Sequence, residues 1–151
     1  MWQLGFTVIE LMLATAVIGL LTALAVPTYA RVIENLKVDT ARKDLLTIAS
    51  QVQRYRTAHD FRLPASLGDL TGIPRNDPWD NPYQYLNFDS DAPGVRALIR
   101  KDHNLHPLNT EFDLYSMGPD GSSNAPLTAA ASRDDVVWAR DGSFVGKAKD
   151  F

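Results

Sequence analysis

The chain has 151 residues, enough for one domain of ordinary size plus an appendage and too few for two comfortable domains. It carries 15 Lys and Arg against 18 Asp and Glu, and this formal charge of −3 excludes the basic balance of a dedicated nucleic-acid-binding protein. It contains no cysteine, which excludes disulfides, thiolate metal sites and cysteine nucleophiles. Residues 1–30 hold one charged group, whereas residues 61–151 hold 9 basic and 13 acidic groups. The sequence therefore predicts a membrane-like N-terminal end and an acidic, soluble C-terminal part.

The N-terminal apolar run spans residues 6–26, and Glu10 is its only charged member. A helix of this length is about 32 Å long, close to the hydrocarbon thickness of a bilayer. A carboxylate in a membrane span is costly unless it is paired, so Glu10 is a candidate functional residue; a carboxylate that snorkels or is protonated is the alternative. A secretory signal peptide cleaved after residues 23–25 is a second interpretation of the run, but residues 1–5 lack Lys and Arg and the run is long.

The sequence around Glu10 resembles the processing motif of type IV pilins and of the related pseudopilins. The resemblance implies that prepilin peptidase cleaves after Gly5 and that the new amine of Phe6 is methylated. It also implies that Glu10 pairs with the Phe6 amine of a neighbouring subunit during filament assembly, which agrees with the need of a buried carboxylate and a buried ammonium for partners. The motif is Gly5-Phe6-Thr7-Val8-Ile9-Glu10-Leu11-Met12.

The leader, residues 1–5, departs from this family because family leaders carry Lys or Arg just before the glycine. The basic residues that follow the span would, by the positive-inside rule alone, favour a cytoplasmic C-terminus. The family orientation is the reverse, with a single-pass anchor in the bacterial inner membrane and the C-terminal head in the periplasm. We give the motif precedence and attribute the missing charges to a misplaced start codon or a truncated leader.

Beyond Pro27, which is expected to kink a helix rather than to end it, apolar residues recur at helical spacing. No Gly or Pro interrupts residues 28–60. The pattern predicts a single helix from Phe6 to about Ala58, with a transmembrane and assembly part at residues 6–30 and an amphipathic stalk at residues 31–60. The apolar stripe of the stalk consists of Val38, Ala41, Leu45, Ile48, Val52 and Tyr55.

Residues 61–151 have the composition of a globular head, since eight of the nine prolines lie there and separate short β-branched and aromatic segments. We expect an α+β, pilin-like fold in which the long N-terminal helix packs on a small antiparallel sheet with long C-terminal loops. The predicted strands are Tyr83–Phe88, Val95–Arg100, Phe112–Met117, Val136–Trp138 and Phe144–Val145.

Three segments of the head resemble the general secretion pathway protein G family, the major pseudopilins of type II secretion. Residues 76–85 resemble its Asp-Pro-Trp-Gly-Asn-Pro-Tyr signature, residues 112–121 its Ser-Leu-Gly-x-Asp-Gly stretch, and residues 132–138 its closing Asp-Asp/Ile-x-x-Trp segment. The resemblance implies a structural subunit of a periplasmic pseudopilus that drives the export of folded proteins. Its partners would be further copies of itself, minor pseudopilins, the inner-membrane secretion platform and prepilin peptidase. The loop at residues 63–75 is shorter than in that family, and the loop at residues 120–134 is longer.

The same resemblance implies a calcium ion in the C-terminal loops, which have no disulfide to hold them. Carboxylate and carbonyl oxygens are the ligands that Ca²⁺ takes, six to eight at a time. From the residues alone, an ordinary Pro-Asp-Gly turn and a solvated acidic corner are the favoured interpretation. Carried over residue by residue, the implied ligands are the side chains of Asp120, Asp134 and Asp135 and the carbonyl groups of Met117 and Ser132.

The sequence does not predict an enzyme. Its histidines, His59, His103 and His106, lie at the predicted helix end and in a polar loop, and a pair such as His103 with Asp102 is common on surfaces. The sequence contains no hydrolase, zinc-protease, phosphate-loop or dinucleotide motif and no interleaved basic and aromatic patch for single-stranded nucleic acid, so no nucleic-acid partner is expected.

Two other classes remain as alternatives to the pseudopilin. A type IV pilus subunit for adhesion, motility or DNA uptake would share the anchor and the stalk, but the missing cysteine pair and the Asp-Pro-Trp segment argue against it. A membrane-anchored or secreted calcium-binding module would share only the head, and the motif at residues 6–12 argues against it.

Overall fold

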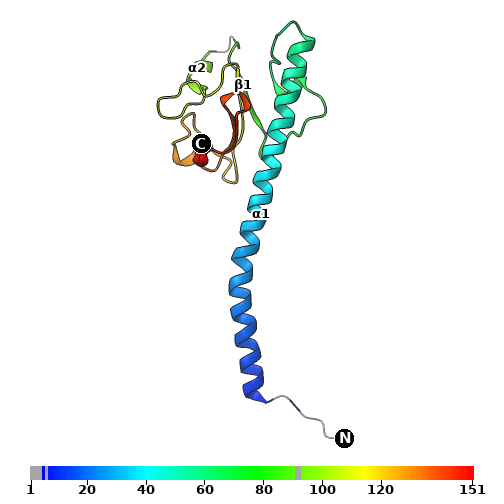
Figure 1. The fold of residues 1–151 in the computed structure, drawn as a ribbon, viewed down its shortest axis with the longest axis vertical. Helices are drawn as coiled ribbons and strands as arrows, with labels where there is room; N and C mark the ends of the chain where they lie inside the picture. Colours follow the sequence, from blue (N-terminus) through cyan, green and yellow to red (C-terminus); the bar gives the residue numbers. More distant parts are fainter. Residues whose placement is uncertain (1–4, 6, 91–92) are drawn as a thin grey trace. The chain divides into compact units, whose positions relative to one another are not determined.

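A computed structural model describes residues 5, 7–90 and 93–151 (Figure 1). The chain divides into two compact units, Met1–Leu36 and Lys37–Phe151, and each unit is described by itself below. Helix α1 (Val8–Ala58) contains the division between them. The helix is continuous through Pro27 and ends at Ala58, as the sequence predicts.

The first unit consists, in its described part, of the N-terminal portion of α1, whose large apolar side chains are exposed. By length and composition, α1 is the one helix among the described residues that could cross a membrane. Three threonine hydroxyls of this portion donate hydrogen bonds to the helix backbone, for example Thr22 to the carbonyl of Ile18 at 2.8 Å. These bonds satisfy the hydroxyl groups within the helix itself, which suits an apolar surrounding.

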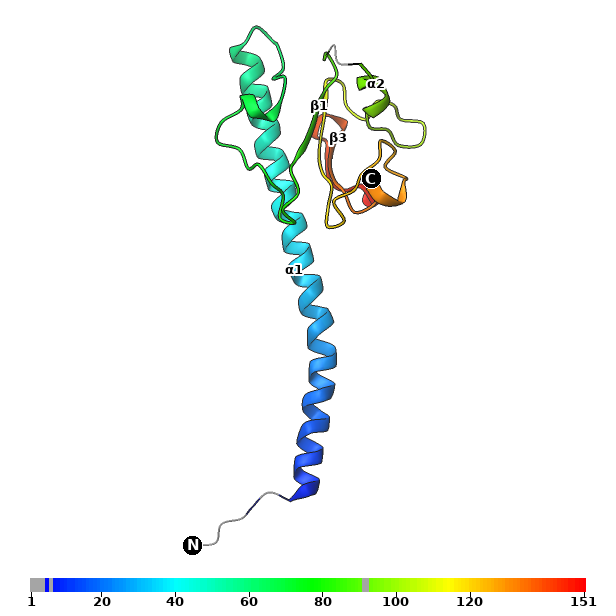
Figure 2. The same cartoon turned by 180° about the vertical axis from the view of Figure 1, so that it is seen from behind.

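The second unit contains a four-stranded antiparallel sheet within the described residues, in the order β1-β2-β3-β4. Strands β1 and β3 of this sheet are labelled in Figure 2. Its register places Leu114 opposite both Tyr85 and Trp138, and Trp138 opposite Val145. This arrangement confirms the predicted α+β class and four of the predicted strands. The strands are β1 (Gln84–Asn87), β2 (Phe112–Ser116), β3 (Val136–Ala139) and β4 (Phe144–Lys147).

The main core of the second unit lies between the C-terminal portion of α1 and one face of the sheet. The predicted apolar stripe is confirmed, because Ala41, Leu45, Ile48 and Val52 are fully buried and the two end members of the stripe, Val38 and Tyr55, pack against them. From the sheet, Phe112 stacks on Trp138 with ring centroids 4.7 Å apart.

The opposite face of the sheet is covered by the C-terminal loops, and a second apolar cluster around Leu108, Leu127 and Val137 lies there. Because side chains alternate along a strand, Asp113 and Tyr115 of β2 belong to this loop-covered face. Short 3₁₀ helices lie in these loops and in the segment before β1. They are η1 (Leu67–Asp69), η2 (Ala130–Ser132), η3 (Arg140–Gly142) and η4 (Ala148–Asp150).

The predicted strand Val95–Arg100 is wrong, because residues Val95–Leu98 form the short helix α2. Gly94 precedes it in the left-handed region, with φ 88°, and its carbonyl accepts a hydrogen bond from the N–H of Ala97. Apart from Val95, the helix residues Arg96, Ala97 and Leu98 are good helix formers. The glycine turn and these propensities outweigh the β-branched character that suggested a strand.

Candidate functional site

The predicted processing site lies at the start of the described chain. Gly5 is exposed. Phe6 lies outside the described residues, as does the rest of the leader, residues 1–4. Cleavage after Gly5 and methylation of Phe6 therefore stay predictions.

Glu10, the predicted assembly residue, is part of a reciprocal cap at the start of α1. Its Oε2 accepts hydrogen bonds from the backbone N–H and from the hydroxyl of Thr7, both at 2.9 Å. In return, the Glu10 N–H donates to the Thr7 hydroxyl at 3.3 Å. This pattern is a capping box, and the spacing Thr-x-x-Glu in the sequence is its recognisable signal. The carboxylate thus has a partner in its own chain before any neighbouring subunit is present.

In the head, the three segments that carry the family resemblance converge on one corner. The N–H of Asp120 donates to Oδ2 of Asp134 at 3.4 Å, although the two residues come from different segments. The side-chain amide of Asn81, from the segment at residues 76–85, donates to the carbonyl of Gly118 at 2.7 Å. The corner is closely packed: a Cβ atom on Gly118 would lie 2.6 Å from the carbonyl oxygen of Asp134.

Asp77 organises the signature segment at residues 76–85. It is buried, and its Oδ1 accepts hydrogen bonds from the N–H groups of Trp79 at 3.0 Å and Asn81 at 2.9 Å. Its Oδ2 accepts a hydrogen bond from the hydroxyl of Ser116 at 2.5 Å. Asp80 occupies the position at which the family signature has glycine. Its φ of 70° lies in the left-handed region, which glycine adopts most readily, and this backbone conformation explains the glycine of the signature. The signature segment therefore forms a turn that is hydrogen-bonded, through Asp77, to Ser116 at the end of β2.

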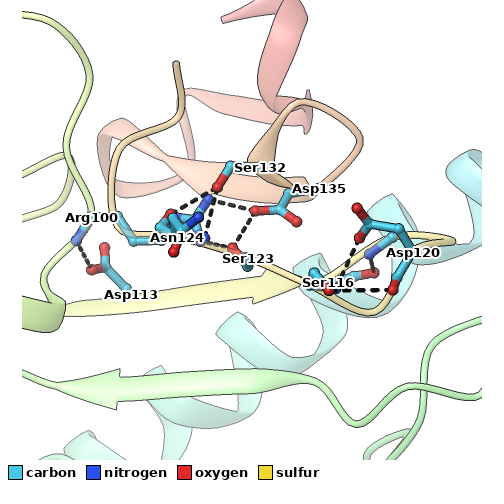
Figure 3. Close-up of polar contacts among 10 residues, drawn as sticks. Arg100, Asp113, Ser116, Asp120, Ser123, Asn124, Ser132 and Asp135 are labelled. Carbon is cyan, nitrogen blue, oxygen red and sulfur yellow. Dashed lines mark hydrogen bonds and ion pairs between the residues drawn. The ribbon is translucent and has the colours of Figure 1, made fainter. Parts of the chain in front are cut away.

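Asp135 has a different environment from the other two acidic residues of the predicted calcium set. It is fully buried, and its Oδ2 accepts hydrogen bonds from Nη2 of Arg100 at 2.6 Å and from the hydroxyl of Ser123 at 2.5 Å. Burial raises the pKa of Asp135 to about 6, against the opposing effects of the Ser123 hydrogen bond and the Arg100 charge. Figure 3 shows its carboxylate directed at Ser123, while Asp120 lies separately beside the end of β2.

The two predicted carbonyl ligands also lie in this region. Met117 directly follows β2 and is partly buried. Ser132 is buried; its hydroxyl accepts the N–H of Asn124 at 2.9 Å and donates to the Asn124 carbonyl at 2.8 Å. The Ser132 carbonyl accepts the N–H of Asp135 at 3.3 Å.

These contacts test how well the predicted donor set fits a calcium ion. The structure brings Asp120 and Asp134 together, whereas the carboxylate of Asp135 is engaged by Arg100. Across residues 5, 7–90 and 93–151, no group of three or more acidic or histidine side chains is placed to hold a metal ion. The five predicted residues therefore do not fit as one ligand set, and calcium binding stays a prediction for the corner of Asp120 and Asp134.

The contacts of His59 and His103 are with residues outside this corner. His59 stacks on Tyr55, and its Nδ1 is 2.8 Å from the Tyr55 carbonyl. His103 forms the expected pair with Asp102, at 2.9 Å, and is largely exposed. These contacts are those of a helix end and a surface loop.

A long N-terminal apolar helix whose C-terminal portion packs on a small antiparallel sheet is the architecture of a pilin-like protein. The chain is 32% identical over 140 residues to the type II secretion system core protein G of Pseudomonas aeruginosa, across 79% of this chain and 85% of that protein. It is 26% identical over 147 residues to the core protein G of Vibrio cholerae, across 85% and 88% of the two chains. It is also 26% identical over 140 residues to that of Pectobacterium carotovorum, across 79% and 78%. The chain therefore belongs to the type II secretion system core protein G family, the major pseudopilins. No protein-family model matches the chain, and no solved structure matches it.

Proposed function

We propose that the chain is a structural subunit of the periplasmic pseudopilus of type II secretion, with no catalytic role. The similarity to the core protein G of Pseudomonas aeruginosa over 79% of the chain carries the proposal. The exposed apolar portion of α1 supports it, because such a surface requires lipid or other subunits around it. Before assembly this helix would anchor the subunit in the inner membrane, with the head in the periplasm.

Assembly would bury the helix against further copies of the chain and against minor pseudopilins, on the inner-membrane secretion platform. Prepilin peptidase would first cleave after Gly5 and so free the amine of Phe6. Glu10 would then exchange part of its cap on Thr7 for the Phe6 amine of a neighbouring subunit. The exchange is favourable because a carboxylate and an ammonium that enter an apolar filament each need an opposite charge.

The function is tested by complementing a strain that lacks this gene with variants at Glu10. Glu10→Gln retains the acceptor that the capping box uses but removes the charge, whereas Glu10→Ala removes both. If charge pairing drives assembly, both variants insert into the membrane and both lose filaments and the secretion of exported enzymes. Normal filament yield with Glu10→Gln would contradict the pairing role and leave only the cap. Loss of surface pili with intact secretion would instead identify a type IV pilus subunit.

Processing is tested on the mature protein purified from the same membranes. The intact mass is expected to correspond to a chain that starts at a methylated Phe6. A chain that starts at Val26 would identify a conventional signal peptide, and a chain of that kind could not form the proposed filament.

Calcium enters the proposal only at the corner of Asp120 and Asp134. A cation there would be held by these two carboxylates together with carbonyl oxygens, for which Met117 and Ser132 are the candidates. With few charged ligands and an exposed Asp120, the contribution is expected to be small. Calcium should raise the melting temperature of the full chain by less than about 5 °C, and Asp134→Ala should abolish the rise. An equal rise in that variant would exclude this corner.

A further inference from the structure

A buried arginine lies at the centre of the C-terminal loops. Arg100 follows α2, and only 2% of its surface is exposed. Its Nη2 forms an ion pair with Oδ2 of Asp135 at 2.6 Å, and its Nη1 donates to the hydroxyl of Ser123 at 2.5 Å. The guanidinium carbon lies 4.1 Å from the centroid of the Tyr115 ring. A charged group is rarely buried to this degree unless it is paired, so the contacts identify a built polar cluster.

The guanidinium joins three parts of the chain that are distant in sequence. The guanidinium contacts both Ser123 and Asp135, and the Ser123 hydroxyl also donates to Asp135 (Figure 3). The backbone N–H of Arg100 donates in addition to Oδ2 of Asp113 on β2, at 2.6 Å. Arg100 therefore connects the loop before β3 to the sheet.

Neighbouring hydrogen bonds close the same loop around this cluster. The N–H of Lys101 donates to the carbonyl of Ala125 at 3.1 Å, and the N–H of Leu127 donates to the carbonyl of Lys101 at 2.9 Å. The two hydrogen bonds between Asn124 and Ser132 join the two halves of the loop. Together with the ion pair, these contacts hold a long connection that has no disulfide.

The position of the guanidinium also decides what Asp135 can bind. A positive group 2.6 Å from the carboxylate occupies one of its oxygens and repels a second cation. The other oxygen, Oδ1, is buried without a hydrogen-bond partner, as is Nε of Arg100. If the guanidinium were removed, Asp135 would lose its charge partner and keep only the Ser123 hydroxyl on Oδ2, so its carboxylate could accept a cation next in sequence to Asp134.

We propose that Arg100 is the built-in structural cation of this head, and that it holds Asp135 and the loop at residues 118–135 in place of a divalent metal ion. The loop then stays ordered without calcium, and any ion at the corner of Asp120 and Asp134 is an accessory. This inference concerns only the head and stands whether or not the chain forms a pseudopilus.

The test uses the purified full chain in detergent, melted in excess calcium and in excess chelator, with near-ultraviolet circular dichroism as the signal of tertiary packing. The wild-type melting temperatures in the two conditions should agree within about 5 °C. Arg100→Met leaves a buried, unpaired carboxylate and should melt about 10–20 °C lower in chelator. In that variant, calcium should restore a substantial part of the loss, because Asp135 is now free to bind it.

Two further variants separate charge from packing. Arg100→Lys retains the positive charge and should melt between the wild type and Arg100→Met, with no response to calcium beyond that of the wild type. Arg96→Met removes an exposed arginine of α2 and should match the wild type in both conditions. A wild-type melting temperature that falls by more than about 5 °C in chelator would overturn the proposal even if Arg100→Met failed to fold. A calcium response of Arg100→Met no larger than that of the wild type would also overturn it.

Discussion

At the scale of single residues, the corner of the head depends on the absence of a side chain at Gly118. This glycine has φ 65°, and a Cβ atom there would lie 2.6 Å from the carbonyl oxygen of Asp134 and 3.0 Å from its Oδ2. The contact is with backbone, so a flexible side chain cannot yield to relieve it. The Gly-x-Asp-Gly stretch of the family signature is thus explained by close approach as well as by the turn.

Gly118→Ala is therefore expected to lower the free energy of unfolding by about 2–4 kcal/mol, from left-handed strain plus a steric clash. Gly72→Ala is the matched control, because Gly72 has φ 70° but nothing lies within 4 Å of the added carbon. The control should show only the strain, about 1–2 kcal/mol. Urea unfolding of the two variants in detergent measures both values, and equal losses would contradict a close approach at Gly118.

The sequence offered candidate residues for the site but did not predict the side chains that contact them. The motif similarity located Asp120, Asp134 and Asp135, and the structure brings the first two together. The partner of Asp135 is Arg100, which lies 35 residues away at the end of the predicted strand Val95–Arg100, and that strand prediction is wrong. Pairwise contacts at such separation depend on tertiary packing, for which local sequence patterns carry no signal. The cap between Thr7 and Glu10 is local, and its spacing alone could have revealed it.

At the scale of elements, helical periodicity was the strongest predictor. The stripe at spacings of three and four residues correctly identified the face of α1 that packs on the sheet, because burial of that face requires this period. Strands β1 to β4 were predictable from aromatic and β-branched runs between turns. Helix α2 was not, since a segment of four residues is too short to display a period and its start depends on the conformation of Gly94.

The packing of α1 can be tested with two adjacent leucines of the same helix. Leu45 is fully buried in the core, whereas Leu46 is 51% exposed. Leu45→Ala should lower the free energy of unfolding by about 2–5 kcal/mol, because it leaves a cavity against the sheet. Leu46→Ala has the same effect on helix propensity and should change stability by less than about 0.5 kcal/mol. Denaturant unfolding followed by near-ultraviolet circular dichroism distinguishes them, and similar losses would contradict the assigned face.

At the scale of the whole molecule, the boundary between the two compact units separates the exposed apolar N-terminal portion of α1 from its buried residues. The buried residues of the helix, such as Leu45 and Val52, belong to the unit Lys37–Phe151. Both apolar clusters are composed of residues of that unit. The apolar residues of the unit Met1–Leu36 that the structure describes are exposed, as expected of a surface reserved for lipid or for other subunits.

A chain that begins at Lys37 should consequently fold by itself. It retains both apolar clusters, the sheet and the polar cluster around Arg100, and the residues that it loses belong to neither apolar cluster. The new helix end lacks a cap, which costs about 1 kcal/mol and leaves the core intact. The fragment should be monomeric without detergent and should unfold in one cooperative transition, which calorimetry and analytical ultracentrifugation can measure.

A fragment that begins at residue 61 is the matched control, because it lacks the helix that covers Phe112, Leu114 and Trp138. Exposure of this sheet face removes most of the main core, so the shorter fragment should aggregate or show no cooperative transition. Leu45→Ala in the fragment from Lys37 should cost the same free energy as in the full chain, since its contacts are unchanged. A broad transition without a heat-absorption peak for the fragment from Lys37 would show that the head needs residues 1–36 to fold, and would contradict the division into two units.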